Sequence, residues 1–567
     1  KKMKKTGAQV LCEGLIHHGV EKIFGIPGGA ILPLYGTLSE YPELDHILVR
    51  HEQGASHAAD GFSRVSGKTG VCFATSGPGA TNLITGMATA MMDSSPMIAI
   101  TGQVSRPGIG KDSFQEIDIT GASLPVTKHN YLVMNAHEIP RVLKEAFIIA
   151  NTGRPGPVLI DIPRDVFIEE FDFDNNFWNE EIKILGYNPP KFTDNSKIDS
   201  ALKLIEQSER PVILAGHGII ISRAYDELLE LAEKAQIPVV TTLLGISSFP
   251  ENHVLSLSFP GMHGVAWASL ALDQADLVIA IGSRFDDRIT GDTSRFATKS
   301  KKIHIDIDPA EINKNINVDV ALIGNAKDIL KQMLPKLKKK THIDWLNHIA
   351  KLKEDHPSLK LKKSNELTGQ YVVKSLSDET DGKSVIVTGV GQHQMWAAQH
   401  YLYCAQNSWI SSGGLGTMGF EVPAALGAKV GAPEKNVWSI AGDGGFQMTL
   451  CELATIVENN IKVKFALLNN NHLGMITQWQ GMFFNEDYQA NAYTANPDFV
   501  KLANAYGMKA LSVDNNEDVR PAIREANNHD GPFLIDFKIK KEENVFPMIP
   551  SGQSVNELLE EPVDGSN

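Results

Sequence analysis

One segment of the chain, residues 437–471, alternates between strand-like and helix-like patterns, and this alternation restricts the fold more than any other feature. The first apolar run, residues 437–441, ends in Gly442-Asp443-Gly444-Gly445. Residues 449–459 then have helical spacing. The second apolar run, residues 463–468, ends in Asn469-Asn470-Asn471. A strand–helix–strand crossover is almost always right-handed and usually joins neighbouring parallel strands. The segment therefore predicts an α/β fold with a parallel sheet.

Polar side chains follow both predicted strands. Because the carboxyl ends of neighbouring parallel strands meet at one edge of a sheet, we expect Asp443 and Asn470 to lie side by side there. A carboxylate and an amide oxygen on glycine-rich backbone suit Mg²⁺ or Ca²⁺ bound to a diphosphate. The motif Gly-Asp-Gly alone is more often an ordinary turn. The metal site is favoured because the Asn-Asn motif follows the neighbouring predicted strand at the matching position.

Composition excludes several classes of protein. The 567 residues are 42% hydrophobic and 21% charged, as in soluble globular proteins, and this length predicts several domains. A net charge of −14 argues against nucleic acid or an anionic membrane as partner. The four cysteines lack paired spacing, which argues against disulfides and zinc and favours a reducing compartment.

No membrane span or export signal is expected. The most apolar stretch, residues 83–100, is interrupted by Asp93-Ser94-Ser95-Pro96 and predicts a buried helix followed by a strand. The opening residues Lys1-Lys2-Met3-Lys4-Lys5 are not followed by the apolar core of a signal peptide. We therefore expect a location in the bacterial cytoplasm, or in the plastid stroma if the chain is organelle-encoded.

Strand-like runs alternate with helical stretches three times along the chain, without a short internal repeat. This predicts an α/β protein with three doubly wound parallel-sheet domains. The expected boundaries are residues 1–164 for the first domain, 165–196 for a linker, 197–335 for the second domain, 336–365 for a second linker, and 366–567 for the third domain with a mobile tail.

The motifs resemble those of enzymes that use thiamine diphosphate (ThDP), and in particular the acetohydroxyacid synthase (acetolactate synthase) large-subunit family. The resemblance runs in order from about Lys5 to about Pro550. It rests on the 442–471 segment and on five further groups: residues 24–29, residues 50–54, residues 75–82, residues 284–288 and residues 473–479.

For the ThDP site, the resemblance implies a role for each matching position. Glu52 would bind the aminopyrimidine ring and promote removal of the thiazolium proton, with its proton exchange favoured by burial. Asp443, Asn470 and the carbonyl of His472 would bind Mg²⁺. The other expected ThDP contacts are Gly391, Gln392, His393, Gly416, Met418, Gly442, Gly444 and Gly445. Met418 taken alone is more often core packing.

The middle domain resembles the FAD-binding domain of the same family. The expected contacts are Gly216, His217, Gly218, Thr241, Leu243, Gly261, Met262, His263, Gly282, Arg284, Asp286, Arg288, Asp306 and Ile307, with Lys183 where the family commonly has Arg. Glycines at strand ends would admit the dinucleotide backbone, while Arg284 and Arg288 would neutralise its diphosphate. The change at Lys183 slightly weakens the FAD assignment.

Other positions resemble the substrate channel. These are Gly28, Phe114, Gln115 and, across a length difference, Lys191, together with Met475 and Trp479 at the pocket for the second oxo acid. Ser105 stands where many plant relatives carry Pro, in a channel that sulfonylurea inhibitors occupy. We expect Gln115, Lys191 and Trp479 to act beside Glu52 in catalysis.

The resemblance implies a carboligase of branched-chain amino-acid biosynthesis with ThDP, Mg²⁺ and FAD as cofactors. Its substrates would be small 2-oxo acids, and it would work as a homodimer or homotetramer, with a small regulatory subunit and neither nucleic acid nor membrane as partner. Two alternatives are a flavin-dependent oxidoreductase of the pyruvate oxidase type and a non-catalytic paralogue. Glyoxylate carboligase is disfavoured because that relative lacks the glutamate present here as Glu52.

Overall fold

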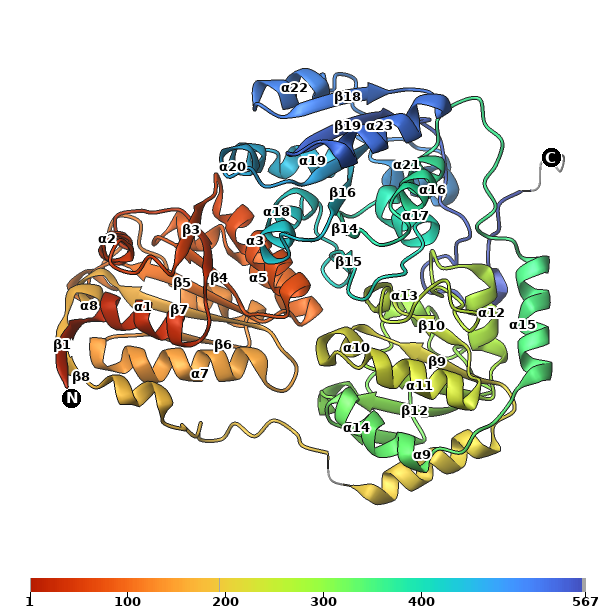
Figure 1. Ribbon diagram of the computed structural model, residues 1–567, viewed down its shortest axis with the longest axis horizontal. Coiled ribbons are helices and arrows are strands. Elements are labelled where there is room, and N and C mark those ends of the chain that lie inside the picture. Colours follow the sequence, from red (N-terminus) through yellow and green to blue (C-terminus); the bar gives the residue numbers. More distant parts are fainter. Residues whose placement is uncertain (1, 193, 563–567) are drawn as a thin grey trace.

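A computed structural model describes residues 2–192 and 194–562 of the chain. They form three lobes, each built on a parallel sheet flanked by helices (Figure 1). The predicted fold class, α/β with three doubly wound parallel-sheet domains, is therefore confirmed. No helix in the described part of the chain combines the length and the apolar character needed to cross a bilayer.

The first lobe, red to orange in Figure 1, contains a six-stranded sheet of order β3-β2-β4-β5-β7-β6. Its central strands are buried on both faces, which explains their continuous apolar sequence. The strands are β2 (Lys22–Gly25), β3 (Asp45–Leu48), β4 (Gly70–Ala74), β5 (Met97–Gln103), β6 (His129–Leu132) and β7 (Pro157–Pro163). The helices are α1 (Gly7–His17), α2 (Leu32–Leu38), α3 (Glu52–Ser66), α4 (Pro78–Thr81), α5 (Ile84–Asp93), α6 (Ile119–Ser123), α7 (Ile139–Asn151) and α8 (Arg164–Ile168).

The middle lobe, yellow to green, contains a five-stranded sheet of order β10-β9-β11-β12-β13. Its strands are β9 (Pro211–Ala215), β10 (Val239–Thr241), β11 (Leu277–Ile281), β12 (Lys301–Asp306) and β13 (Val320–Ile323). Its helices are α9 (Asn195–Gln207), α10 (His217–Ser222), α11 (Tyr225–Ala235), α12 (Ala266–Gln274), α13 (Asp287–Thr290), α14 (Ala326–Met333) and α15 (Ile343–Asp355).

The third lobe, cyan to blue, contains a six-stranded sheet of order β15-β14-β16-β17-β19-β18. Its strands are β14 (Val385–Thr388), β15 (Trp409–Ile410), β16 (Val437–Gly442), β17 (Lys464–Asn469), β18 (Lys509–Val513) and β19 (Phe533–Lys538). Its helices are α16 (Gly369–Glu379), α17 (Gln392–His400), α18 (Glu421–Gly431), α19 (Asp443–Thr449), α20 (Glu452–Glu458), α21 (Gly474–Phe483), α22 (Phe499–Ala505) and α23 (Asn516–Asn528).

The first and third lobes pack through helices α3 and α18, which lie side by side at the centre of the molecule (Figure 1). Glycines allow the two backbones to touch. A Cβ atom at Gly61 would lie 2.1 Å from the carbonyl oxygen of Ala424, and one at Gly427 would lie 1.8 Å from that of Ala58. The contact therefore depends on the absence of side chains on both helices.

Two segments differ from the sequence-based expectation. In the expected linker 165–196, β8 (Glu170–Phe173) pairs antiparallel with β1 (Met3–Thr6), and Trp178 is buried in the core of the first lobe. In the expected linker 336–365, α15 packs on α12 and buries Trp345. Aromatic side chains attach both segments to the lobes, although neither segment has a sustained sequence period.

The tail, expected to be mobile at its end, makes defined contacts up to residue 562. Met548 and Leu559 form an antiparallel bridge, the amide of Ile549 donates to the carbonyl of Met262 (2.8 Å), and Arg295 forms an ion pair with Glu557 (2.7 Å). The tail therefore lies against the middle lobe. Residues 563–567 lie outside the described part of the chain.

Candidate active site

A cavity of about 550 Å³ lies between the middle and third lobes. Its lining includes most of the expected ThDP and metal positions: Gly391, Gln392, His393, Gly416, Met418, Gly442, Asp443, Gly444, Gly445, Asn470 and His472. It also includes Met475 and Trp479, the two positions expected at the pocket for the second oxo acid. On the side of the middle lobe it is lined by Leu243, Met262, His263, Arg284, Asp286 and Arg288, all expected FAD positions. We call it the first cavity.

Asp443 and Asn470 meet in this cavity because β16 and β17 are adjacent and parallel, with Gly442 opposite Leu468. Asp443 is the first residue of α19, so the helix begins six residues before the predicted one; the glycines of its first turn have low helix propensity. Its carboxylate is buried, and Oδ2 accepts a hydrogen bond from Nδ2 of Asn496 (2.8 Å). Burial raises the pKa of this carboxyl to about 6, and the hydrogen bond only partly offsets the shift.

The turn after β17 orders the other two expected metal ligands. Asn471 has a φ of +56°, and the amide of His472 donates to Oδ1 of Asn470 (3.0 Å). A strand-like segment covers the turn, since Leu473 donates to the carbonyl of Asn491 (2.7 Å) and His472 bridges Ala492. The positions of Asn470 and His472 therefore depend on residues about 20 positions further along the chain.

The donor set fits a hard cation held by few protein ligands. Residues 2–192 and 194–562 contain no cluster of three His, Cys, Asp or Glu side chains that could hold a metal by themselves. A Mg²⁺ ion needs no such cluster, because it takes several ligands from water and from substrate or cofactor phosphates. Asp443 supplies the charge, and the oxygens of Asn470 and His472 complete a hard, oxygen-only set.

The glycines beside Asp443 are confined by their neighbours. A Cβ atom at Gly442 would lie 2.8 Å from Nδ1 of His393, and one at Gly444 would lie 2.8 Å from the hydroxyl of Tyr493. His393 is buried, its Nε2 has no hydrogen-bond partner in the described chain, and burial lowers the pKa of its imidazole to about 3. A neutral imidazole, whose Nε2 lies 4.0 Å from Oε1 of Glu421, thus stands beside the expected diphosphate position.

Gln392 lines the cavity and also connects elements of the third lobe. Its Nε2 donates to Oε1 of Gln478 (3.0 Å) and to the carbonyl of Glu543 (2.7 Å). The side-chain amide nitrogen therefore ties α17 to α21 and to the start of the tail, although the residue also lines the cavity.

Glu421, at the start of α18, is a buried carboxyl that the motifs did not reveal. Its Oε2 accepts from the amide of Gly419 (3.0 Å), and burial raises its pKa to about 7. A Cβ atom at Gly389 or at Gly445 would lie within 2.0 Å or 2.2 Å of its oxygens. Glu421 therefore fills the space behind two of the cavity's glycine-rich loops.

Trp479 lines the other end of the cavity, on α21. Its ring is half-buried and contacts Phe483 edge to face, with ring centroids 6.4 Å apart. Its Nε1 is buried and has no hydrogen-bond partner among residues 2–192 and 194–562. A buried indole usually finds such a partner, so this donor is left unmatched by the described residues.

A second cavity, of about 420 Å³, lies against the middle lobe. Its lining includes eight expected FAD positions: His217, Gly218, Leu243, Gly282, Arg284, Asp286, Asp306 and Ile307. Five residues line both cavities: Leu243, Arg284, Asp286, Gly413 and Gly414. The two cavities are therefore neighbours with a common wall. Lys191 lines the second cavity, whereas Gly28, Phe114 and Gln115 line neither.

Several expected FAD positions have another structural reason. A Cβ atom at Gly216 would lie 2.2 Å from the carbonyl oxygen of Gly282, so Gly216 permits contact between two strand-end loops. Gly216 and Thr241 line neither cavity, and Gly261 lines only a small adjacent pocket. Lys183 is exposed and also lies outside both linings.

Arg154, which no sequence motif indicated, also lines the second cavity. Its Nε donates to Oγ of Ser94 (2.8 Å), and its Nη1 lies 3.0 Å from Oε1 of Glu311. The only signal in the sequence was the turn Gly153-Arg154-Pro155 before a buried strand, which is too common to indicate a site.

The residues expected from the first lobe form a separate group. Oε2 of Glu52 accepts from Nδ2 of Asn82 (2.8 Å), and a Cβ atom at Gly79 would lie 3.5 Å from Oε1 of Glu52. Gly77 packs against the backbone of Gln115, which is exposed and has a φ of +58°. Within one chain, neither Glu52 nor Gln115 lines the cavity that holds Asp443.

The helix that begins at Glu52 is held in place by the third lobe. Oε1 of Glu452 accepts from the backbone amides of Arg50 (3.1 Å) and His51 (3.0 Å), and Oε2 accepts from Oγ1 of Thr455 (2.7 Å). Arg50 also forms an ion pair with Glu458 (2.9 Å). Glu452 thus caps α3 from a distant part of the sequence, which no local pattern could reveal.

Comparison with known proteins agrees with this arrangement. Three families match: the N-terminal TPP binding domain of thiamine pyrophosphate enzymes at residues 5–122, the central domain at residues 198–333, and the C-terminal TPP binding domain at residues 389–537.

Curated relatives match almost the whole chain. The acetolactate synthase of Mycobacterium bovis is 47% identical over 98% of this chain and 91% of its own length. The acetolactate synthase large subunit of Corynebacterium glutamicum is 47% identical over 98% and 90%. The probable acetolactate synthase large subunit of Methanocaldococcus jannaschii is 47% identical over 98% and 95%. Together with the three matched domains, these identities show that the chain belongs to the acetolactate synthase large-subunit family of thiamine pyrophosphate enzymes.

Proposed function

We propose that the protein is a carboligase that joins two molecules of pyruvate into 2-acetolactate with release of one CO₂. With 2-oxobutyrate as the second substrate the product is 2-aceto-2-hydroxybutyrate, and both products serve branched-chain amino-acid synthesis. The carrying observation is the meeting of Asp443 and Asn470 in the first cavity, in a chain 47% identical to acetolactate synthases. A carboxylate and an amide oxygen at this edge suit a metal-bound diphosphate.

The residues of the first cavity fit ThDP and Mg²⁺. Asp443, Asn470 and the carbonyl of His472 would hold the metal, His393 and the 442–445 glycines would lie beside the diphosphate, and Met418 would lie under the rings. When bound, ThDP supplies an electron sink for the carbanion that remains after pyruvate loses CO₂. The protein orients the acids and excludes water from the cavity.

The second cavity fits a dinucleotide, and we propose FAD. Arg284 lies at the common wall of the two cavities, where it can neutralise a diphosphate, and Asp306 can accept from ribose hydroxyls. Of the expected positions, Lys183, Gly216 and Thr241 have no cavity contact that supports the proposal. The flavin has a structural role, because the net condensation transfers no electrons to an external acceptor.

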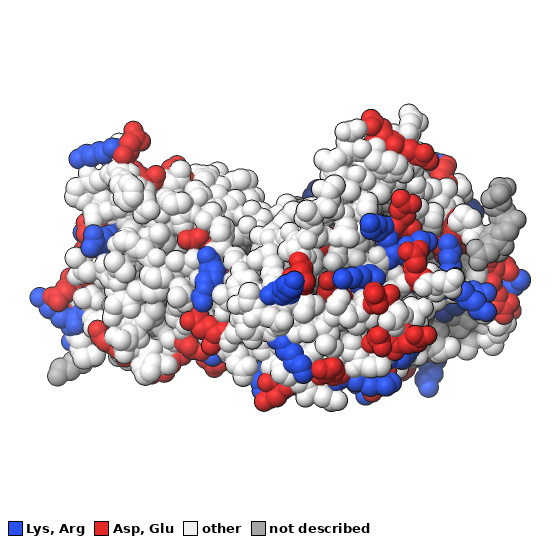
Figure 2. Space-filling view, turned by 90° about the horizontal axis from the view of Figure 1, so that it is seen from above, with Lys and Arg blue, Asp and Glu red and all other residues white. Residues whose placement is uncertain are grey.

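A second copy of the chain is part of the proposal. Glu52 and Gln115 would complete the site from another subunit, since they do not line the first cavity of their own chain. Figure 2 shows a hollow between two lobes with few Lys, Arg, Asp or Glu side chains, as expected for a surface that another subunit covers. The homodimer is the smallest such assembly and a homotetramer a larger one. A small regulatory subunit is the further proposed partner, and the bacterial cytoplasm or plastid stroma the proposed compartment.

An acetolactate assay tests the function directly. The full-length protein with ThDP, Mg²⁺, FAD and pyruvate is expected to release one CO₂ for each acetolactate formed, and removal of Mg²⁺ with EDTA is expected to abolish the reaction. Oxygen consumption in proportion to pyruvate would instead identify the pyruvate oxidase alternative. Binding of ThDP without CO₂ release would identify the non-catalytic paralogue.

Replacing Glu52 tests the proton-transfer role. Glu52→Gln keeps the size of the side chain and its contact with Asn82 but removes the exchangeable acid. We expect ThDP to remain bound and turnover to fall by about 10²-fold or more, the usual effect of removing a positioned acid–base group. Turnover is measured against Glu21→Gln, an exposed glutamate of the same lobe. Equal turnover of the two variants would contradict the assignment.

Replacing Asp443 tests the metal site. Asp443→Ala removes the charged ligand of the proposed set, so retention of ThDP is expected to lose its dependence on Mg²⁺ and to weaken by about 10²-fold, since ligand charge dominates such affinities. Calorimetric titration of ThDP measures the effect, with the exposed Asp530→Ala as control. Wild-type affinity in Asp443→Ala would exclude the metal site.

Replacing Trp479 tests the choice of acceptor. 2-Oxobutyrate exceeds pyruvate by one methylene, whose contact with an apolar pocket is worth about 1–3 kcal/mol. Trp479→Leu is therefore expected to lower the preference for 2-oxobutyrate about tenfold, with a smaller effect on acetolactate formation from pyruvate alone. Products formed from a mixture of both acids measure the ratio. Phe484→Leu, directly after the same helix and outside the cavity lining, is the control. An unchanged ratio in Trp479→Leu would assign the indole to packing.

A further inference from the structure

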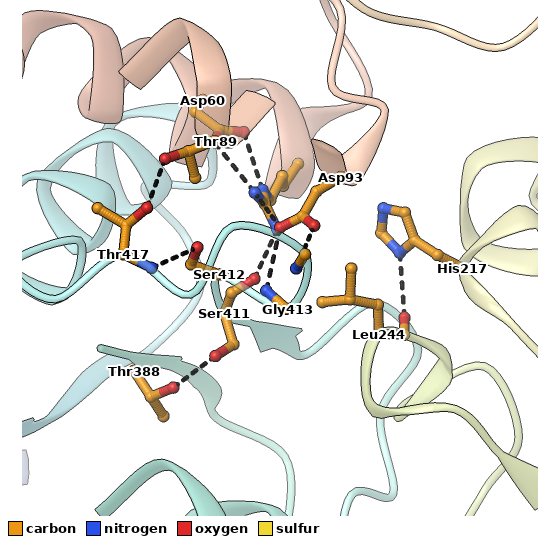
Figure 3. Close-up of polar contacts among 12 residues, drawn as sticks. Asp60, Thr89, Asp93, His217, Leu244, Thr388, Ser411, Ser412, Gly413 and Thr417 are labelled. Atoms are coloured by element: carbon orange, nitrogen blue, oxygen red, sulfur yellow. Dashed lines mark hydrogen bonds and ion pairs between the residues drawn. The ribbon is translucent and has the colours of Figure 1, made fainter. Parts of the chain in front are cut away.

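Two helices of the first lobe hold a buried group of charges beside the wall shared by the two cavities (Figure 3). Arg64 on α3 is bound at both ends of its guanidinium: Nε donates to Oδ1 of Asp60 (2.8 Å), and Nη2 donates to Oδ2 of Asp93 (2.8 Å) at the end of α5. All three side chains are buried, with Asp60 at 0% and Asp93 at 2% exposure. Buried charges at this density need further donors, because two carboxylates face one guanidinium.

The loop 411–418 of the third lobe supplies those donors. Oδ1 of Asp93 accepts from the amide of Gly414 (2.8 Å), and Oδ2 accepts from the amide of Gly413 (3.2 Å). In the opposite sense, Nη1 of Arg64 donates to the carbonyl of Ser411 (2.7 Å). The loop is thus held to the first lobe by three charge-assisted hydrogen bonds within four residues.

The same loop forms the common wall. Gly413 and Gly414 line both cavities, and Gly416 and Met418 line the first. A second tie holds its far end, where the hydroxyls of Thr89 and Thr417 are 2.8 Å apart. A movement of Gly413 or Gly414 would therefore change the wall of both cavities at once.

The charge group also reaches the middle lobe. Ser94, next to Asp93, accepts from Nε of Arg154, whose Nη1 lies 3.3 Å from Asp308 and 3.0 Å from Glu311. The end of α5 thus contacts the third lobe directly and the middle lobe through Arg154. Asp93 itself lines the second cavity, whereas Asp60 lines neither.

We infer that Asp93 is a positioning residue that fixes the shared wall in advance, so that each cavity binds its cofactor without waiting for the other to be filled. The inference rests on the proposed function, because it takes the cavities to hold ThDP and FAD. If the wall were loose, only a fraction of the molecules would be competent to bind, and the apparent affinity for either cofactor would fall by that fraction. The first cofactor would then order the wall for the second, and cooperativity would appear.

Asp93→Asn and Asp60→Asn form the matched test. Both variants remove one buried negative charge beside Arg64 and keep the side-chain size, but only Asp93 contacts the loop. In the wild type and in Asp60→Asn, the affinity for ThDP with Mg²⁺ is expected to change less than about twofold when FAD is added. In Asp93→Asn, the affinity for ThDP alone is expected to fall about tenfold, and FAD is expected to restore most of it, within the usual range of coupling between sites.

Isothermal titration of the full-length protein measures both affinities, each with and without the other cofactor. Gly414→Ala is a second variant, and it leaves the charged side chains of Arg64 and Asp93 unchanged. Its Cβ atom would lie 2.8 Å from Oδ1 of Asp93, so the loop must move. This variant is expected to show the same FAD-dependent recovery as Asp93→Asn. Circular dichroism and thermal melting report whether each variant is folded.

Three results would overturn the inference. They are unchanged ThDP affinity in both Asp93→Asn and Gly414→Ala, a loss of affinity that FAD does not restore, and equal behaviour of Asp60→Asn and Asp93→Asn. In each of these the wild type still binds both cofactors, so the proposed function stands. A wild type that binds neither ThDP nor FAD would overturn the proposed function together with the inference.

Discussion

The adjacency of β16 and β17 is the constraint on which the site depends. Because the two strands are parallel and in register from Trp438 to Gly442, the residues that follow them reach the same edge of the sheet. A carboxylate and an amide that are 27 positions apart in the sequence thereby share one cavity. The burial that accompanies this position raises the pKa of the Asp443 carboxyl, which makes a nearby cation the natural partner of its charged form.

Hydrogen bonds between lobes hold the other parts of the site, the start of α3 and the loop 411–418, near that edge of the sheet. Glu452 caps the helix that begins at Glu52, and Asp93 with Arg64 fixes the loop that separates the cavities. Both ties are buried ionic contacts to backbone groups, so they fix geometry more than they add stability. Apolar packing of α3 on α18 brings the lobes together, and the polar contacts determine their exact register.

Local patterns predicted the strands of the sheets well, because central parallel strands are buried on both faces and their sequence is continuously apolar. They failed where order comes from partners far along the chain. The tail packs on the middle lobe through Ile549 and Glu557, and β8 pairs with β1, about 165 positions earlier in the chain. The start of α19 was missed because glycines fill its first turn, and Lys183 was assigned by resemblance to a position outside both cavities.

The sequence by itself determined the fold class, through the periodicity of its strands and helices, and the family, through the resemblance of its motifs. It also predicted the chemical character of the proposed metal site, from residue types at fixed spacing. Only the tertiary structure decided which residues share a cavity. It showed Arg154 rather than Lys183 at the second cavity, Glu421 behind the glycine-rich loops, and Glu52 outside the first cavity of its own chain. The physical reason is that hydrogen bonds and steric contacts act over a few ångströms in space, and separation along the chain does not record them.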